Sequence, residues 1–401
     1  MKKNQNSKAF LLLLTGALTG FGPFMTDFYL PAFPQLQEYF GTTISLVQLS
    51  LTFGMIGLAG GQLIFGPLSD KFGRSTPLDI SLVLFVLSTV VCLLSKNIHC
   101  FLFFRLLQGI SAGGGVVIAR SIAVDVYSGR ELSRFFSILA AIQGVAPISA
   151  PILGGILLSM TDWHGIFGIL LLFGLVLLAT TLVFRESLPI SKRIRNTKTA
   201  FNAYLPILKN RQFMRYVLTQ AFAFAVLFAY IAASPFIFQQ HYQLSPALYS
   251  LCFALNAGCA MIGSFWAGRF KDEQKGLVHA TQVFACISVI TAAALIGQLS
   301  FVVVESCLLC LSISFGSIMP PTTSLALNLE RKNSGNASAV LGFVQFLFGA
   351  LVSPLVGIGN VLSTTGIIIG AGSLLTLLIC PKVSTELKLK TLGDNSGVLL
   401  K

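Results

Sequence analysis

The sequence predicts an all-α membrane protein whose twelve transmembrane helices form two pseudo-symmetric six-helix bundles. Of its 401 residues, 54% are hydrophobic and only 10% are charged. An ordinary soluble domain carries about 25% charged residues, so a soluble globular fold is excluded. The apolar residues gather in runs that are each long enough to cross a bilayer. Prolines and glycines of the first half recur in the second half at a nearly constant spacing, which indicates a duplicated bundle.

Each predicted helix is a mainly apolar run of about 20 residues, the length that crosses a hydrocarbon core of about 30 Å. The first run continues through Tyr29 without a small-residue cleavage site, so we expect no cleaved signal peptide. The twelve predicted helices cover residues 10–36, 43–65, 76–95, 98–122, 135–158, 165–184, 216–238, 246–268, 277–297, 301–326, 337–359 and 362–380.

The positive charge of the chain indicates its orientation in the membrane. The formal net charge is +13, with 27 Lys and Arg. Nearly all of these lie in the termini or in the loops on one side, while Arg105 and Arg120 lie within the fourth helix and only Lys96 falls on the other side. Such an asymmetry marks the cytoplasmic side. We therefore expect a multi-pass protein of a bacterial inner membrane, with both termini in the cytoplasm and no binding of nucleic acid.

The reactive side chains are dispersed along the chain. Eight cysteines are scattered through the apolar runs, and Cys307-x-x-Cys310 lies inside the tenth helix without a histidine cluster or a second cysteine pair nearby. Isolated cysteines in apolar runs are typically small buried hydrophobic residues. The sequence shows no nucleophile paired with a base and no phosphate-binding loop. We therefore expect no metal, no cofactor and no enzymatic activity.

The domain organisation follows from one long polar segment, residues 185–215, which we interpret as a cytoplasmic linker. It separates an N-terminal bundle over residues 1–184 from a C-terminal bundle over residues 216–380, and residues 381–401 form a cytoplasmic tail. Two bundles related by an axis along the membrane normal place a binding site between them at mid-depth. The residue pairs that share an offset of 202–207 are Pro31 and Pro235, Gly66 and Gly268, Gly109 and Gly316, and Pro147 and Pro354.

The first helix contains the most unusual residue of the chain. Asp27 is the only acidic residue well inside a predicted span of the N-terminal half. A charge at such depth costs about 2.5–3.5 kcal/mol or more, so residues of this kind are functional by default. Because a low dielectric favours the neutral form of a carboxyl group, Asp27 is a candidate for proton coupling and for substrate binding. The alternative is a structural ion pair between Asp27 and a neighbouring arginine.

The link between the second and third helices reads Gly66-Pro-Leu-Ser-Asp70-Lys71-Phe-Gly73-Arg74. We expect a loop of about ten residues at a membrane face, in which Gly66 and Gly73 permit tight turns. Asp70 at the end of one helix then faces Lys71 and Arg74 near the start of the next. These charges can lock the two helices and release them when the helices move, which makes the five residues a candidate conformational switch. The alternative is an ordinary basic loop that fixes topology.

The fourth helix contains Arg105-x-x-Gln108-Gly109, followed by three consecutive glycines that let helices approach closely. Arg105 stays charged at any accessible pH and can neutralise a nearby carboxylate. We therefore assign Arg105 to proton coupling together with Asp27. Gln108, one turn further along the helix, is a candidate for substrate binding.

The fifth helix contains two prolines and a glycine pair, in Gly144-Val-Ala-Pro147-Ile-Ser-Ala-Pro151-Ile-Leu-Gly154-Gly155. Prolines interrupt helical hydrogen bonding and paired glycines allow close packing, so this helix is a candidate gate or pivot. The alternative is a kink with no role in a conformational change.

These motifs resemble signatures of the major facilitator superfamily. Residues 66–74 resemble the family's loop signature G-x-L-[SA]-D-[RK]-x-G-R-[RK], with Ser75 in place of the last basic residue. Arg105 and Gln108 match the R-x-x-Q-G signature of helix 4, whose arginine the family places beside the proton site. The fifth helix resembles the antiporter motif of drug:proton exporters, G-x-x-x-G-P-x-x-G-G, with Ala146 in place of one glycine. That motif is associated with export over uptake.

Further stretches narrow the resemblance to the Bcr/CflA drug-resistance subfamily over nearly the whole chain. One departure is Val124, where the subfamily often has an arginine before Asp125, and this weakens the case for a charge relay at that point. The matching stretches are Asp27-x-Tyr29-Leu30-Pro31-Ala32-x-Pro34, Ser234-Pro235-Phe236, Met319-Pro320 followed by Ala326, and Gly335-x-Ala337-Ser338-Ala339.

The resemblance implies rocker-switch alternating access, in which proton entry drives the export of small amphipathic drugs or antibiotics. The partners are then a small-molecule substrate, protons and the lipid bilayer, and we expect a monomer. Aromatic residues of helices 1 and 7, among them Phe28, Tyr29 and Tyr230, are candidates for binding an apolar ligand. The alternative is that most of these rings face lipid or pack between helices.

Several functions stay open at this point. The same fold could export a specific metabolite, siderophore or small peptide, or could take up its substrate with protons. A non-transporting membrane receptor is a further alternative, whereas a channel is disfavoured, because the chain has too few charged residues for a continuous polar lining. Glu305, near the outer end of helix 10, is a minor candidate for a second proton carrier. The lack of another obvious acidic residue beside Asp27 suggests a low proton count.

Overall fold

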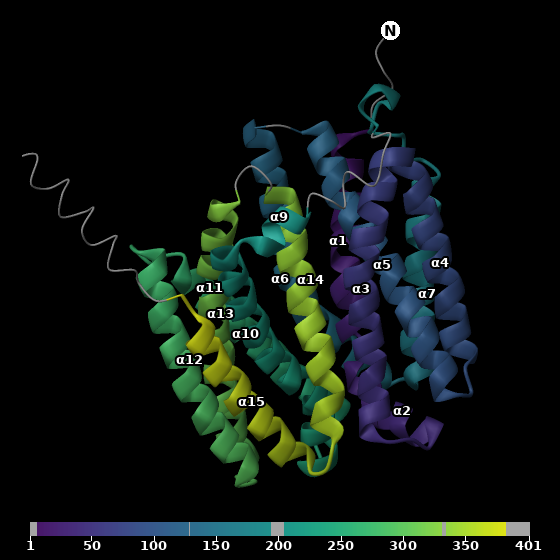
Figure 1. Ribbon diagram of the computed structural model, residues 1–401. Coiled ribbons are helices and arrows are strands. Elements are labelled where there is room, and N and C mark those ends of the chain that lie inside the picture. Colours follow the sequence, from purple (N-terminus) through teal and green to yellow (C-terminus); the bar gives the residue numbers. More distant parts are fainter. Residues whose placement is uncertain (1–5, 128, 194–203, 331–333, 382–401) are drawn as a thin grey trace, which may run out of the picture.

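The computed structural model describes residues 6–127, 129–193, 204–330 and 334–381. In these ranges the long helices lie side by side in two groups (Figure 1). The first group contains α1 (Lys8–Asp27), α3 (Ile44–Phe72), α4 (Ser75–Leu94), α5 (Ile98–Val126), α6 (Gly129–Leu158) and α7 (Trp163–Thr181). The second contains α10 (Arg211–Pro235), α11 (Pro246–Ala267), α12 (Glu273–Ile296), α13 (Phe301–Leu329), α14 (Ser334–Val352) and α15 (Val361–Ile379).

Three of these helices continue through a short irregular segment. The chain passes from α1 through the 3-10 turn η1 (Leu30–Ala32) into α2 (Phe33–Phe40). Helix α10 continues as the π-helix η3 (Phe236–His241), and α14 continues as the 3-10 segment η5 (Ser353–Gly357). Proline lacks the N–H that an α-helix needs, so it accounts for each interruption. Pro31, Pro235 and Pro354 lie at the three sites.

The membrane-spanning character of the helices agrees with the predicted fold class. Among the described residues, eleven helices are long and apolar enough to cross a bilayer. The remaining long helix, α6, has 30 residues, of which Val145–Leu158 form a shorter apolar stretch. Helix α6 packs against α1 and against α11, so it lies inside the assembly and completes a set of twelve.

The link between α3 and α4 is shorter than the sequence predicts. Helix α3 continues to Phe72 and α4 begins at Ser75, so the connection is only Gly73 and Arg74. Gly66 therefore lies inside α3 and does not form a turn, which corrects the prediction. Gly73 has φ of +95°, a conformation that residues with a side chain rarely adopt.

The end of the predicted linker is also helical. Residues 204–209 form the short helix α9 (Tyr204–Lys209), and α10 begins at Arg211 rather than at residue 216. The earlier part contains the 3-10 turn η2 (Ile190–Lys192), while residues 194–203 lie outside the described ranges. The predicted tail over 381–401 lies outside them as well, apart from Pro381.

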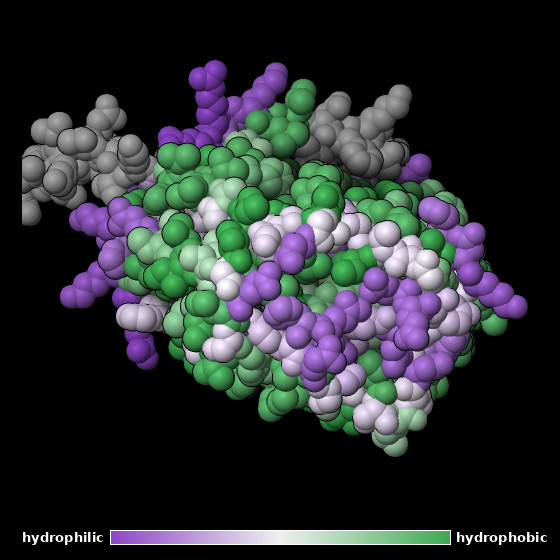
Figure 2. Space-filling view, turned by 90° about the horizontal axis from the view of Figure 1, so that it is seen from below, coloured by the Kyte–Doolittle hydropathy of each residue, from purple (hydrophilic) through white to green (hydrophobic). Residues whose placement is uncertain are grey.

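The two ends of the helix assembly differ in charge. We call the end that carries Arg74, Arg193 and Arg211 the basic face, and the end that carries α2 the α2 face. Figure 2 views the α2 face, where hydrophilic side chains occupy much of the surface and apolar side chains border it. The few charged residues in this region include Glu38 and Lys96.

The predicted repeat is visible in close helix contacts. A Cβ added to Gly109 in α5 would overlap the backbone of Gly54 in α3, and a Cβ added to Gly316 in α13 would overlap the backbone of Ala260 in α11. Both partners are related by nearly the same offset in sequence, since the glycines are 207 residues apart and their partners 206. The same small-residue contact therefore packs equivalent helices in both bundles.

The two bundles meet through two equivalent helix pairs, α6 with α11 and α3 with α14. The hydrogen bonds that join described side chains to the other bundle all lie toward the α2 face. In this structure the bundles are therefore held together at the α2 face. The bonds are Gln48 Nε2 to Ala232 O (3.0 Å), Thr52 Oγ1 to Ala350 O (2.8 Å), Gln239 Nε2 to Pro31 O (3.0 Å) and Gln240 Nε2 to Gln37 Oε1 (3.0 Å).

Candidate substrate and proton site

Asp27 is the last residue of α1 and is buried, with 7% of its surface exposed. Helix α1 ends there because the chain bends into η1, whose N-terminal turn contains Pro31. Asp27 belongs to none of the ion pairs found between described residues. Its carboxyl group is therefore buried in protein and, within the described ranges, has no cationic side chain within 4 Å.

Arg105 in α5 is fully buried close to the same helix end. Its Nη2 donates a 3.0 Å hydrogen bond to the Met25 carbonyl, and its Nη1 donates to Gln108 Oε1. Its guanidinium carbon lies 4.2 Å from the centre of the Tyr29 ring, and its Nε has no partner. Arg105 thus contacts the backbone two residues before Asp27 without forming an ion pair with it. In this conformation Arg105 does not neutralise Asp27 directly, and no other described arginine forms the structural ion pair of the alternative.

Gln108 and Tyr29 direct their polar atoms toward protein groups. Gln108 Nε2 donates to Thr89 Oγ1 at 2.7 Å, and the Tyr29 hydroxyl lies 3.0 Å from Ser50 Oγ. Both side chains are fully buried, and Phe28 is almost fully buried. In this conformation they therefore position Arg105 and close the wall around the end of α1, and their polar groups are already satisfied.

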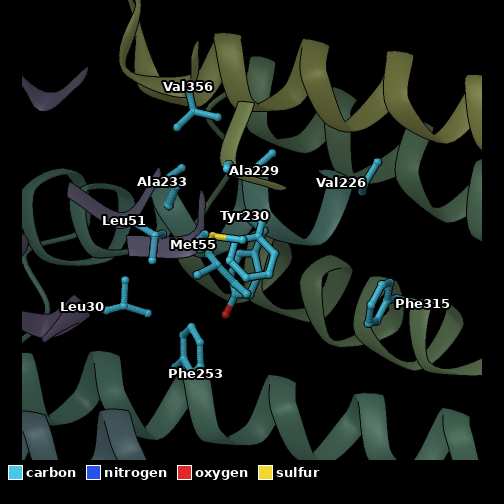
Figure 3. Close-up of a cluster of buried hydrophobic side chains, with 14 of the residues drawn as sticks. Leu30, Leu51, Met55, Val226, Ala229, Tyr230, Ala233, Phe253, Phe315 and Val356 are labelled. Atoms are coloured by element: carbon cyan, nitrogen blue, oxygen red, sulfur yellow. The ribbon is translucent and has the colours of Figure 1, made fainter. Parts of the chain in front are cut away.

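Tyr230 in α10 lies where the two bundles meet. Figure 3 shows its ring beside Met55 of the first bundle, with Leu51 and Phe253 close by. The Tyr230 and Phe253 rings are stacked, with centroids 6.2 Å apart. The Tyr230 hydroxyl is buried without a hydrogen-bond partner. It is therefore an unsatisfied polar group beside apolar side chains of both bundles.

A set of partly exposed aromatic rings lies at mid-span. Phe224 of α10 stacks on Phe228 with centroids 4.7 Å apart and lies 5.5 Å from Phe346 of α14. Phe346 packs against the apolar cores of both bundles. Rings at the junction of the bundles can form an apolar wall for a ligand. Phe21, a further aromatic residue of the first helix, is fully buried against Phe85, as the packing alternative expects.

The predicted switch residues form a charge network at the basic face. Arg74 is buried, and its Nη1 donates to Asp70 Oδ1 at 2.5 Å. Its Nε and Nη2 both donate to Asp125 at the end of α5. Lys71 is exposed, and its ammonium group lies over the Phe72 ring. The structure therefore places Asp70 and Arg74 together and leaves Lys71 outside the network.

Two acidic residues of this network were not assigned a role from the sequence. Glu186, just after α7, accepts hydrogen bonds from the backbone N–H groups of Arg74 and Ser75, at 2.9 and 3.2 Å. It satisfies free donors at the start of α4. Asp125 also accepts a 2.9 Å bond from Ser187 Oγ. In the sequence, Asp125 is marked only by the weakened resemblance at Val124, and Glu186 only as an acid within a strongly basic segment.

The motif of the fifth helix lies inside α6, with Pro147 and Pro151 in the helix interior and Gly144 near its middle. A Cβ added to Gly154 would overlap the carbonyl of Phe28, the residue after Asp27. A Cβ added to Gly155 would overlap Ser250 in α11 of the other bundle. The glycine pair therefore packs α6 against the helix end that carries Asp27 and against the opposite bundle.

Comparison with known proteins agrees with this architecture. The family model described as Major Facilitator Superfamily matches residues 12–354. The chain belongs to the major facilitator superfamily. Members of this family are membrane transporters of small molecules and are not enzymes. This chain is accordingly a multi-pass membrane transporter.

Individual relatives cover nearly the whole chain. The chain is 39% identical to the MFS-type transporter YdgK of Bacillus subtilis, across 96% of this chain and 97% of that one. It is 28% identical to the bicyclomycin resistance protein homolog of Haemophilus influenzae, with coverage of 88% and 90%. It is 26% identical to the multidrug resistance protein MdtL of Salmonella paratyphi C, with coverage of 92% and 94%.

The same fold occurs in solved structures. A bacterial homolog of the human lysosomal transporter Spinster, in an inward-facing and unoccupied conformation, superposes with a TM-score of 0.71. The match covers 94% of this chain and 95% of that chain at 15% identity, which shows a common fold.

The structure also brings together two polar residues of the transporter's C-terminal bundle, of which only Glu305 is a candidate from the sequence. Glu305 of α13 is buried and accepts a hydrogen bond from Asn256 of α11. The sequence shows Glu305 only as a lone glutamate near a predicted helix end. The contact with Asn256 could not be predicted from the sequence, because Asn256 lies 49 residues away in the chain. Among the described residues, no group of three or more His, Cys, Asp and Glu could hold a metal ion.

Proposed function

We propose that this transporter is a proton-coupled antiporter of the Bcr/CflA type, which exports small amphipathic drugs or antibiotics by alternating access. The observation that carries the proposal is the burial of Asp27 at the point where α1, α6 and α11 converge, with no cationic partner among the residues that the structure describes. A buried carboxylate without a counter-ion is costly, so a proton or a substrate has to compensate its charge.

The orientation follows from the charge distribution. The basic face is the cytoplasmic side of a bacterial inner membrane, so both termini are cytoplasmic. The bundles hold together at the α2 face, through bonds such as Gln48 to Ala232 and Thr52 to Ala350. This supports a state in which the site communicates with the cytoplasm.

The cycle follows from the chemistry of one carboxyl group. Substrate that binds from the cytoplasm favours release of the Asp27 proton inward, and reprotonation from outside favours release of the substrate. The half-buried rings of Phe224 and Phe346 give an apolar ligand a surface without strict polar specificity. A proton that crosses about 150 mV supplies about 3.5 kcal/mol, enough to sustain a gradient of roughly 300-fold for a neutral substrate exchanged one for one.

The substrate class is supported by the names of two relatives. One is a bicyclomycin resistance protein homolog and the other a multidrug resistance protein, and both names point to drugs.

The resemblance of residues 144–155 to the antiporter motif supports export rather than uptake, and its glycine pair packs between the end of α1 and the opposite bundle. We propose that one chain completes the cycle as a monomer, because the site lies between the bundles of a single chain.

The test measures accumulation of ethidium and of chloramphenicol in cells, with and without a proton uncoupler. Cells with the wild type should accumulate less of at least one probe than cells without the protein, and the uncoupler should remove the difference. Asp27→Asn should abolish export, whereas Glu38→Gln, at an exposed acid of α2, should leave it unchanged. Export that survives Asp27→Asn, or that ignores the uncoupler, would refute the proposal.

A further inference from the structure

The C-terminal bundle contains a second buried carboxyl group. Glu305 lies in the second turn of α13 and is 8% exposed. Its Oε1 accepts a 2.9 Å hydrogen bond from Asn256 Nδ2, and Asn256 Oδ1 accepts a 2.9 Å bond from Ser312 Oγ. Helices α11 and α13 thus hold one oxygen of Glu305 in a defined position.

The other oxygen of Glu305 has no partner. Its Oε2 is buried without a hydrogen bond. The hydroxyl of Tyr230 is also buried without a hydrogen bond, and it lies close enough to Glu305 for an electrostatic interaction with the carboxyl group. Asn256 already donates to Oε1, so it does not satisfy Oε2. A carboxylate oxygen is an acceptor only, and an unsatisfied buried acceptor carries the full desolvation cost.

No described group balances a negative charge at this point. Glu305 belongs to no ion pair between described residues. The titratable groups that face it are the phenol of Tyr230 from α10 and the thiols of Cys252 and Cys259 from α11. Phenols and thiols are mainly neutral near pH 7. Helix α12 brings no charged side chain to this depth within the described residues, because Glu273, Lys275 and His279 lie in its first two turns at the basic face.

A proton is the counter-ion that fits this site. Oε2 has almost no accessible surface, so an organic cation cannot reach it in this conformation. We propose that Glu305 is a second proton-binding site, so that each bundle carries one exchangeable proton, on Asp27 in the first bundle and on Glu305 in the second. This second site rests on the proposed antiport and raises the number of protons exchanged in each cycle from one to two. The sequence alone suggests a lower number.

The position of Tyr230 connects this site to the movement of the bundles. Its ring and Met55 of the first bundle belong to one buried apolar cluster, which forms a contact between the bundles (Figure 3). When the bundles separate at the α2 face, that contact opens and water can reach the Tyr230 hydroxyl and Glu305 Oε2. The proton then passes between Oε2 and water, as carboxylate plus proton gives carboxylic acid, and the reverse reaction follows on release.

The test is an infrared difference spectrum of the full-length protein in lipid nanodiscs, between acidic and alkaline buffer. The C=O stretch of a protonated carboxyl group in an apolar site is separate from that of exposed acids, and each such group that titrates gives one band. The wild type should show two bands. Glu305→Gln should lose one of them, Asp27→Asn should lose the other, and Glu38→Gln should keep both.

Asn256→Ala gives a second readout. Because it removes the donor to Oε1, it should shift the Glu305 band without abolishing it. Elution of each variant as a single species confirms that it is folded. Identical spectra for wild type and Glu305→Gln would overturn the proposal. The measurement needs no transported substrate, so it stays decisive even if drug export by this protein fails.

Discussion

Arg74 binds Asp125 side-on, with Nε 2.8 Å from Oδ2 and Nη2 3.1 Å from Oδ1. Two parallel bonds of this kind fix both the distance and the direction between the partners. Nη1 of the same guanidinium donates to Ser69 Oγ at 2.8 Å and to Asp70. One side chain at the link after α3 therefore joins α3 to the end of α5, which makes it the centre of the basic-face network.

Arg74→Ala should destabilise the protein strongly, because it leaves Asp125 largely buried without its cation. Removal of one partner from a buried pair typically costs about 3–5 kcal/mol. Arg74→Lys should recover only part of this loss, since an ammonium group cannot make the two parallel bonds. The measurement is thermal unfolding in a fixed detergent. Lys71→Ala is the control, because Lys71 is exposed and outside the network, and its unfolding temperature should match the wild type. Equal unfolding of Arg74→Ala and wild type would contradict this account.

Gly154→Ala should impair export, because the new methyl group would overlap the Phe28 carbonyl beside Asp27. Overpacking of this kind costs about 1–3 kcal/mol and displaces the helix end that carries the carboxyl group. Gly168→Ala in α7 is a matched control, since a Cβ there meets no atom within 4 Å. Ethidium efflux from loaded cells, corrected for protein level, compares the two. Similar efflux in both variants would show that close packing at Gly154 is unimportant.

Arg105→Lys should abolish export while the protein still folds. The lysine ammonium cannot simultaneously reproduce the contacts to Met25 O, to Gln108 and to the Tyr29 ring. A buried cation–π contact alone contributes about 2 kcal/mol. The expected signature is a wild-type elution profile in detergent with efflux reduced to that of Asp27→Asn. Full efflux by Arg105→Lys would show that positive charge suffices there and that the observed geometry is unnecessary.

A cross-link at the α2 face should hold the transporter in the conformation described here. The side chains of Gln37 and Gln240 meet across the bundles at 3.0 Å, in a contact that solvent can reach. The double variant Gln37→Cys/Gln240→Cys, in a background without the eight native cysteines, should react with a short bismaleimide and lose export. Each single variant treated in the same way should keep its export. Continued export by the cross-linked double variant would mean that the α2 face need not open.

The helices could be predicted from the sequence because apolar length and the bilayer thickness together fix where each span lies. The link at residues 66–74 could not, because a helix can continue through Gly66 and Pro67 when neighbouring helices support it. Burial of Asp27 followed from its place in an apolar run. The partners of Arg105 and Glu305 depend on rotamers and on helices distant in sequence, so no local pattern contained them.

The most direct test of the central claim is proton movement in proteoliposomes that enclose a pH-sensitive dye. With an imposed gradient of chloramphenicol or ethidium, wild type should move protons opposite to the probe that it transports, and Asp27→Asn should move neither. Movement of a probe by wild type with no change in internal pH, or normal exchange by Asp27→Asn, would contradict an antiport cycle built on this carboxyl group.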